Sequence, residues 1–388
     1  MSDETGGGSA NVVSRFVARL VPGKQPRKTL DIATASTRQL VWLNFKKHRV
    51  ATASLVVIVV IYVVTIFAPF FAPYEPTRFD ADRRLQPPQR LRFISDEGLH
   101  LRPFVYGFTR ERNPETLRLE YEVDTSQRYP IYFFERGEEY HLFAGIRGNL
   151  HFFGVREGRV YLLGADTLGR DMFSRILYGG RISMSIGLIG VAVSLFLGIV
   201  IGGIAGLVGG WIDNIIQRLM ELLRSLPSIP LWMGLSAAVP QEWSPVQVYI
   251  GIVVILSLIA WTGLGRVVRS KFLSLRSENF VQLARLSGAS NSRLIFKHMV
   301  PSFASHIIAE VTLAIPRMIL AETALSFLGI GLRPPTISWG VLMQTAQNIR
   351  TVAQAPWLLL PGVAVIIAVI AFNFVGDGLR DAADPYSH

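Results

Sequence analysis

The chain has 388 residues, half of them hydrophobic, and its 39 basic and 28 acidic residues give a net charge of +11. Its apolar residues gather in long runs that a water-soluble core does not need, so composition excludes an ordinary soluble domain and indicates a membrane protein. The absence of cysteine excludes disulfides, thiolate metal sites and cysteine nucleophiles.

Six segments are candidates for membrane-spanning helices. An α-helix rises 1.5 Å per residue, so about 20 apolar residues cross a hydrocarbon core of ~30 Å. The candidates are residues 50–71, 182–210, 214–239, 246–264, 303–328 and 357–375, of which the third and fifth contain a few charges. A signal peptide does not explain the first run, because its polar leader is too long and no small-residue cleavage site follows. We therefore predict an all-α polytopic membrane protein with six transmembrane helices.

Basic residues lie in two clusters that define the topology. Residues 1–49 form a polar N-terminal tail with nine basic residues, and seven more lie between the fourth and fifth spans. Basic residues near span ends stay in the cytoplasm, so we expect both clusters and both termini there and no nucleic-acid site. Residues 36–49 intersperse Leu40, Trp42 and Phe45 with basic residues. This pattern fits either an interfacial amphipathic helix or an ordinary basic flank.

A polar insert, residues 73–162, follows the first span (50–72). It contains 14 Arg, 14 acidic residues and no Lys. Its length frees it from the positive-inside rule, so its neighbours place it outside. Alternating apolar residues at 117–123, 131–134 and 150–153, separated by turn-like Arg136-Gly137 and Glu157-Gly158, predict a β-rich extracytoplasmic insert. The spacing of its histidines, His100, His141 and His151, matches no metal template.

Residues 163–388 form the remaining core with five predicted spans, and charged side chains precede the first of them. Asp166, Arg170, Asp171 and Arg181 lie around the external start of the second span. A carboxylate–guanidinium network there would hold the helix entrance. A scaffold role is favoured over contact with a substrate.

Small residues recur at every fourth position of the second span. A step of four residues turns a helix by 400°, so they form one slowly drifting ridge. The ridge comprises Gly190, Ser194, Gly198, Gly202, Gly206 and Gly210. Such a ridge lets another helix approach closely in lipid, and a helix loosened by glycine is the alternative.

The basic loop at about 270–301 predicts two short helices around a glycine. The first covers residues 279–287 and breaks at Gly288, and the second begins after Asn291 or Ser292 and stops before Pro301. Together they would form a compact knob protruding from the membrane.

Three ionisable residues lie within the fifth predicted span. Glu310 and Arg317 are seven residues apart on one helical face, and Glu322 is about 120° away from Glu310. Charges at this depth are costly and face the protein interior or a wet cavity. They would line a translocation path or pair with a second subunit, and the sequence does not separate these two roles.

Sequence signatures of catalysis are missing. The chain has no Gly-x-x-x-x-Gly-Lys-Ser/Thr loop, no Gly-x-Ser-x-Gly elbow, no His-Glu-x-x-His helix and no dinucleotide-binding fingerprint. We expect no catalytic residue, no metal and no cofactor, so energy must arrive through a partner.

The glycine-centred loop resembles that of binding-protein-dependent ABC importers. Their loop reads Glu-Ala-Ala, three residues, Gly, nine residues, then an apolar residue two before Leu-Pro. Gln282-Leu283-Ala284, Gly288 and Val300-Pro301 fit this spacing, whereas Gln282, Leu283 and His298 depart from the family residues. Further matches indicate the oligopeptide/dipeptide/nickel type of permease. They are residues 163–171, 174–175, 178–183, 322–332, 334–335, 338–340 and 376–381. The insert lies outside the resemblance.

This resemblance implies a type I ABC importer fold and a non-catalytic permease subunit in a bacterial inner membrane. The expected partners are a second permease subunit forming a heterodimer, two cytoplasmic ATPase subunits, an extracytoplasmic solute-binding protein and the lipid bilayer, with no nucleic acid. Gln282, Ala284, Gly288, His298 and Pro301 would belong to the ATPase-coupling loop. Peptides are the expected solutes; oligosaccharides, opines or nickel remain open. A membrane sensor or scaffold with an external ligand-binding domain is the alternative from another class.

Overall fold

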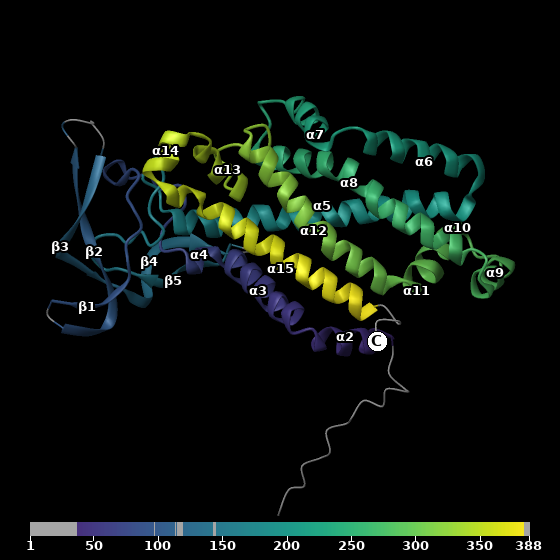
Figure 1. Ribbon diagram of the computed structural model, residues 1–388, viewed down its shortest axis with the longest axis horizontal. Coiled ribbons are helices and arrows are strands. Elements are labelled where there is room, and N and C mark those ends of the chain that lie inside the picture. Colours follow the sequence, from purple (N-terminus) through teal and green to yellow (C-terminus); the bar gives the residue numbers. More distant parts are fainter. Residues whose placement is uncertain (1–36, 97, 113, 115–118, 143–144, 384–388) are drawn as a thin grey trace, which may run out of the picture.

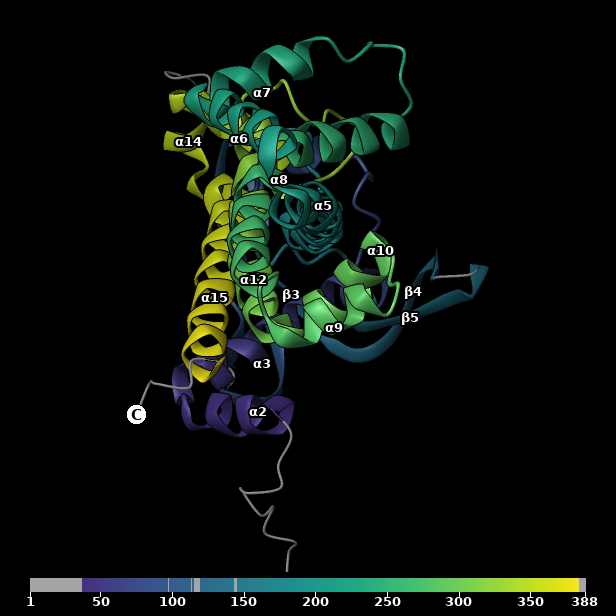
Figure 2. The ribbon, with the colours of Figure 1, turned by 90° about the vertical axis from the view of Figure 1, so that its right-hand side faces the viewer.

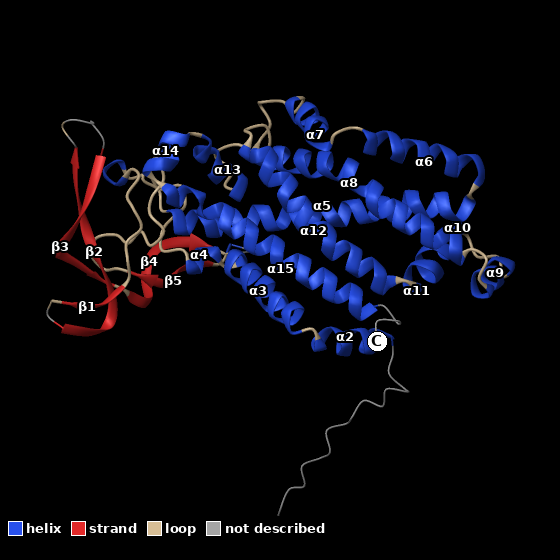
Figure 3. Cartoon of the chain, viewed as in Figure 1, coloured by secondary structure: helices blue, strands red, loops and turns tan. Residues whose placement is uncertain are grey.

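A computed structural model describes residues 37–383 except 97, 113, 115–118 and 143–144. It is mostly helical, with a small β region at one end of a long helical bundle (Figures 1 and 3). The α-helices are α2 (Thr37–Lys47), α3 (Arg49–Ile66), α4 (Ala68–Phe71), α5 (Met172–Val208), α6 (Gly210–Ser225), α7 (Ser228–Ala237), α8 (Pro245–Leu275), α9 (Asn279–Leu286), α10 (Asn291–Arg293), α11 (Val300–Ser302), α12 (Ala304–Phe327), α13 (Trp339–Met343), α14 (Ile349–Gln354) and α15 (Leu360–Ala383). The short 3-10 helices are η2 (Ala81–Arg83), η5 (Gln344–Gln347) and η6 (Pro356–Leu359), and η4 (Leu294–Met299) is a π-helix.

Five helices in the described part of the chain are long and apolar enough to cross a membrane. They are Arg49–Ile66, Met172–Val208, Pro245–Leu275, Ala304–Phe327 and Pro356–Ala383. The third predicted span, residues 214–239, is instead divided between α6 and α7. The division falls at Leu226 and Pro227, whose backbones are extended, and α6 carries charges along its length. Proline lacks the N–H that would continue the helical ladder, which explains the break.

Two of the helices extend beyond their predicted apolar runs. α5 has 37 residues and starts ten residues before position 182, because Asp171 caps it by accepting a hydrogen bond from the backbone N–H of Ser174. α8 has 31 residues and begins with a capping box between Ser244 and Gln247. Hydrophobicity marks only the part of a helix that needs lipid, whereas capping decides where the helix begins.

The bundle is organised around α5. Figure 2 shows α5 nearly end-on, with α8 and α12 beside it and α15 further out. The main core joins α3, α5, α8, α12 and α15 and contains Met184, Leu256, Ile319 and Phe372, all buried. The predicted interfacial segment 36–49 contains α2, whose Phe45 is buried against this core while Trp42 is exposed.

The β region lies within residues 92–154 and consists of two antiparallel sheets. One has the order β1 (Arg92–Ser95), β2 (Gly98–Arg112), β3 (Leu119–Pro130), and the other pairs β4 (Tyr132–His141) with β5 (Arg147–Gly154). Of the alternation predicted at 117–123, positions 117 and 118 lie outside the described residues. The turn predicted at Arg136-Gly137 is wrong: both residues lie inside β4, at a register shift. A Cβ at Gly137 would stand 2.7 Å from the His151 ring, so this glycine permits a close approach within the sheet.

The second sheet is joined to the end of the first span. Phe152 of β5 packs against Phe70 and Phe71 of α4. Buried His151 lies with Nδ1 2.6 Å from the Ala72 carbonyl oxygen and Nε2 3.0 Å from that of Glu138. The strands are therefore held against the membrane-spanning part by aromatic packing and a buried imidazole.

Candidate functional site

The ridge of small residues on α5 faces α8 of the same chain. A Cβ at Gly198 would lie 3.0 Å from the Gly265 backbone nitrogen, and one at Gly202 would lie 2.9 Å from the Gly265 Cα. A Cβ at Gly206 would meet the Arg269 carbonyl oxygen at 2.7 Å. These backbone contacts leave no room for a side chain, so three consecutive turns of α5 touch α8 directly.

The two ends of the ridge differ from its centre. A Cβ at Gly190 would stand 3.0 Å from Met318 of α12, and the buried Ser194 hydroxyl donates to the Gly190 carbonyl at 2.8 Å. The Ser257 hydroxyl of α8 donates to the same carbonyl at 3.0 Å. Gly210 differs from the predicted pattern, because it begins α6 with a φ of 62° and nothing stands within 4 Å of its Cβ position. The ridge thus ends at Gly206.

The charged residues before α5 form a buried network. Asp166 pairs with Arg170, with 2.7 Å between a carboxylate oxygen and a terminal guanidinium nitrogen, and also with Arg175 at 3.5 Å. Arg175 is not among the residues predicted from the sequence, and it also donates to the Pro76 carbonyl at 2.8 Å. Arg181 lies further along α5, over the ring of Tyr178. The network therefore ties the start of α5 to the segment after the first span.

Asp171 serves this network as a helix cap. One of its carboxylate oxygens accepts hydrogen bonds from the Ser174 backbone N–H at 2.8 Å and the Ser174 hydroxyl at 2.6 Å. Burial, which disfavours the charged carboxylate, raises the pKa of Asp171 from 3.8 to about 6, although the Ser174 hydrogen bonds oppose this rise.

The basic loop folds as a knob around Gly288. This residue has a φ of 79°, its N–H donates to the Arg285 carbonyl, and the Ala289 N–H donates to the Ala284 carbonyl, each at 3.0 Å. This pair of hydrogen bonds is the Schellman motif, in which glycine takes the left-handed position that ends a helix. α9 therefore ends because of Gly288.

The second half of the knob differs from its predicted form. The cap of α10 is Ser290, which accepts from the Arg293 N–H, in place of the expected Asn291 or Ser292. The chain then continues through the π-helix η4 directly into α11, which contains Pro301 as its second residue. The predicted stop before Pro301 is therefore wrong.

One face of the knob is anchored and the other is exposed. Val281, Leu294 and Met299 are buried against Phe272 of α8, and Ala284 packs at the edge of this cluster. Gln282 is exposed and donates to the Arg276 carbonyl at 2.8 Å, and His298 is half-buried. Leu283 and Leu286 project outward, with 63% and 84% of their surface accessible. Exposed leucines on a rigid, anchored knob are suited to contact with another protein.

The three ionisable residues of α12 separate into two environments. Glu322 is completely buried, and its two carboxylate oxygens accept hydrogen bonds from the hydroxyls of Ser183 at 3.0 Å and Ser326 at 2.8 Å. Ser183 in turn accepts from the Trp339 backbone N–H at 3.1 Å. Glu322 therefore connects α12 to α5 and, through Ser183, to α13.

Glu310 and Arg317 instead line a cavity of about 470 Å³ between α5, α6, α7, α8 and α12. Arg224, Arg266 and Trp232 line the same cavity, as does Ser194 of the ridge. Three arginines and one glutamate thus line the same cavity. Arg224 and Trp232 could not be assigned to this cavity from the sequence, because they come from α6 and α7, whose packing against α8 and α12 depends on tertiary contacts.

A further ion pair holds α6 to α8. Asp213 accepts two hydrogen bonds from Arg269, one of them 2.6 Å long from a terminal nitrogen, in a bidentate geometry. No sequence pattern points to this pair, since its members are 56 positions apart. It fixes α6 at the end of the bundle that carries the knob (Figure 1).

Comparisons with known proteins agree with this arrangement. Residues 198–386 match the family model described as binding-protein-dependent transport system inner membrane component, and residues 36–88 match the N-terminal transmembrane domain of oligopeptide transport permease C. The chain is 39% identical to a dipeptide transport system permease protein of Alkalihalophilus pseudofirmus over 57% of its own length and 71% of the relative's. It is 37% identical to an oligopeptide transport system permease protein of Haemophilus influenzae over 58% and 70% of the two chains, respectively.

Proposed function

The chain belongs to the family of binding-protein-dependent transport system inner membrane components, and we propose that it is the permease subunit through which an ATP-driven importer moves peptides or solutes of similar size. Permeases of this family hydrolyse no ATP; a separate subunit does so, and a binding protein delivers the solute. The resemblance deduced from the loop motif is thereby confirmed. The peptide class comes to this chain from its dipeptide and oligopeptide relatives.

The observation that carries the mechanism is the knob of α9, α10, η4 and α11. It lies at the end of the bundle opposite the strands (Figure 1). Gln282, Ala284, Gly288, His298 and Pro301 belong to it, and its exposed Leu283 and Leu286 offer an apolar contact. Two cytoplasmic ATPase subunits would grip this knob and that of a second permease, and their closure would rock the helices joined to it.

The cavity bounded by Glu310 and Arg317 supports a translocation path. Charges at membrane depth are stable only where they pair or meet water. One carboxylate and three guanidinium groups around an open volume of about 470 Å³ fit a wet passage better than a closed ion pair. A heterodimer with the second permease would complete its walls. Glu322 would serve the scaffold instead, because its hydrogen bonds are satisfied within the protein.

The six-span topology is part of the proposal. α6 and α7 run in sequence along one side of the bundle, from the knob end toward the strand end (Figure 1), and would together make the third crossing. Both termini, the tail 1–49 and the loop at 270–301 would then face the cytoplasm, and the insert 73–162 would face outward. The core 163–388 would contain the remaining five crossings.

Transport by the reconstituted complex tests this function. Proteoliposomes containing both permeases and the ATPase subunits should take up a labelled peptide only with ATP and loaded binding protein. Leu286→Ser should lower the stimulated ATPase rate and uptake together. Leu101→Ser, on a fully exposed leucine of β2 at the other end of the molecule, is the matched control and should change neither. Uptake of oligosaccharide, opine or nickel but not peptide would reassign the solute, and equal behaviour of the two leucine variants would contradict the docking role.

A further inference from the structure

A second, smaller pocket lies toward the strand end of the bundle, where α7 leads into α8 and where α12 is followed by the segment before α13. Its volume is about 220 Å³. Ligand pockets that enclose a whole drug-sized molecule are larger, about 300–1,000 Å³, so this space suits one terminal group of an extended solute. Its walls include Gln241 and Trp243 from the first connection and Ile330 and Arg333 from the second.

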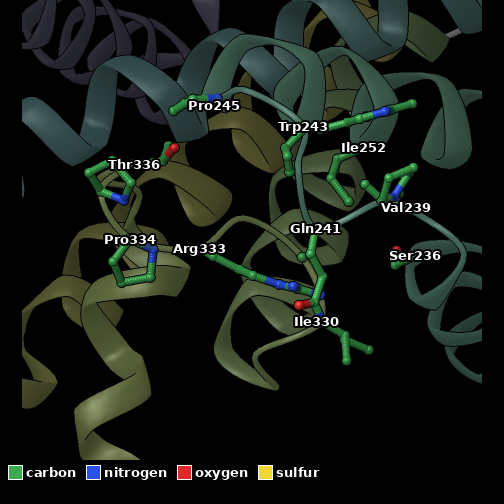
Figure 4. A pocket seen from close by; sticks show the side chains of 14 residues that line it. Ser236, Val239, Gln241, Trp243, Pro245, Ile252, Ile330, Arg333, Pro334 and Thr336 are labelled. Carbon is green, nitrogen blue, oxygen red and sulfur yellow. The ribbon is translucent and has the colours of Figure 1, made fainter.

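Arg333 is the one formally charged residue that lines this pocket. Figure 4 shows its side chain extending across the pocket toward that of Gln241, which points back from the facing loop. No ion pair joins Arg333 to any other residue in the described part of the chain, and Glu242, next to Gln241, is not among the lining residues. The guanidinium is therefore available to an anion from outside the chain.

A buried hydroxyl in the same wall lacks a partner. Ser236 of α7 is completely buried and lines the pocket, and its Oγ makes no hydrogen bond to any group that the structure describes. Buried polar groups in folded proteins are almost always hydrogen-bonded, so an unpartnered one at the wall of a pocket points to a ligand that completes it. Arg333 and Ser236 come from different elements and are independent observations of one site.

The pocket is stacked on the charged cavity described above. Ile252 lines the pocket and Leu256 lines the cavity, and both are buried on α8. Four residues along a helix correspond to about 6 Å, so one helical turn separates the two spaces. The inner cavity presents Arg224, Arg266 and Arg317 beside the single carboxylate of Glu310, so its formal charge is positive. Positive charge thus continues from the outer pocket inward.

We propose that Arg333, with Gln241 and Ser236, forms an outer subsite for the carboxylate of the incoming solute. The planar guanidinium matches a carboxylate in two parallel hydrogen bonds, the amide and the hydroxyl add neutral ones, and Trp243 with the prolines covers the adjoining apolar part. A single positive charge balances a carboxylate, whereas a phosphate dianion would remain uncompensated. This subsite rests on the proposed import function and defines which solutes it favours.

The test compares two peptides that differ only in this group. Proteoliposomes with the complete transporter take up a labelled tripeptide with a free C-terminal carboxylate, or the same tripeptide as its C-terminal amide. Arg333→Gln should lower uptake of the free acid by about tenfold and leave uptake of the amide at the wild-type rate. Arg333→Lys should fall between them, because lysine keeps the charge but loses the fork geometry. Ser236→Ala should lower uptake of the acid alone, by less than Arg333→Gln.

Dividing each variant's rate by the wild-type rate for the same peptide removes any preference of the binding protein. Glu242→Gln, in the same loop but outside the lining, is the control and should match the wild type for both peptides. An equal fall for both peptides with Arg333→Gln would overturn the subsite and assign Arg333 to docking or folding, and no change in either would also overturn it. A wild-type transporter that imports neither peptide would instead overturn the proposed function itself.

Discussion

Adding a methyl group at Gly202 tests how closely α5 and α8 approach. The alanine Cβ would lie 2.9 Å from the Gly265 Cα and 3.0 Å from its carbonyl carbon. Carbon atoms in contact prefer about 3.5–4.0 Å, so the two backbones must separate by roughly 0.6 Å or more. Overpacking of this kind costs about 1–3 kcal/mol.

The matched control is Gly263→Ala on α8, because nothing stands within 4 Å of that Cβ position. Each substitution replaces glycine inside a helix and gains about 0.5–1 kcal/mol of helix propensity. This gain is common to both, so the difference between the two variants isolates the steric cost.

The assay heats the detergent-solubilised transporter and measures the fraction that stays monodisperse on size exclusion. Gly202→Ala should lose its fold at a lower temperature than Gly263→Ala, and Gly202→Leu at a lower temperature still. Gly202→Ala at or above the stability of Gly263→Ala would refute close packing at this position.

Four further outcomes are expected. Gly288→Val should insert normally but fail to couple ATP turnover to uptake, because a β-branched residue at the φ of 79° costs about 1–3 kcal/mol. Gly288→Asn should retain coupling, because asparagine tolerates this left-handed conformation. Wild-type transport by the valine variant would exclude this loop as the coupling element. A cysteine at Thr125 should react with an impermeant reagent in intact cells and one at Ser290 should not, and equal labelling would contradict the six-span topology. Burial raises the pKa of Asp171 to about 6, so its contribution to folding stability is present below pH ~4 and is lost as the pH rises through 6. Asp171→Asn should therefore gain stability relative to the wild type between pH 4 and 7, by at most about 3 kcal/mol. Parallel curves of stability against pH for the two proteins would show that burial does not perturb this carboxyl. Glu322→Ala should lower the stability of the fold by about 1–3 kcal/mol for each serine hydroxyl left unsatisfied. Glu322→Gln should lower it by less. An alanine variant as stable as the wild type would exclude the structural role of Glu322.

Features that depend only on residues close together in the chain can be predicted from the sequence. Apolar runs long enough to cross a bilayer locate five spans directly, because the cost of placing polar groups in hydrocarbon acts on each segment separately. The turn at Gly288 follows from one residue's access to positive φ, and the period of four on α5 follows from helix geometry alone. The Glu-Ala-Ala-like spacing around Gly288 is sufficient to identify the family.

Other features were decided only by tertiary structure, because they join residues far apart in the chain. Helical periodicity places Glu322 and Glu310 on different faces but does not show that one meets two serines and the other a cavity. The sequence likewise does not show that α8 is the helix packed against the ridge of small residues on α5, or that one pocket is lined by both Ser236 and Arg333. Each of these sites depends on which helix faces which, and that choice is made by packing summed over the whole bundle, a quantity that no local pattern contains.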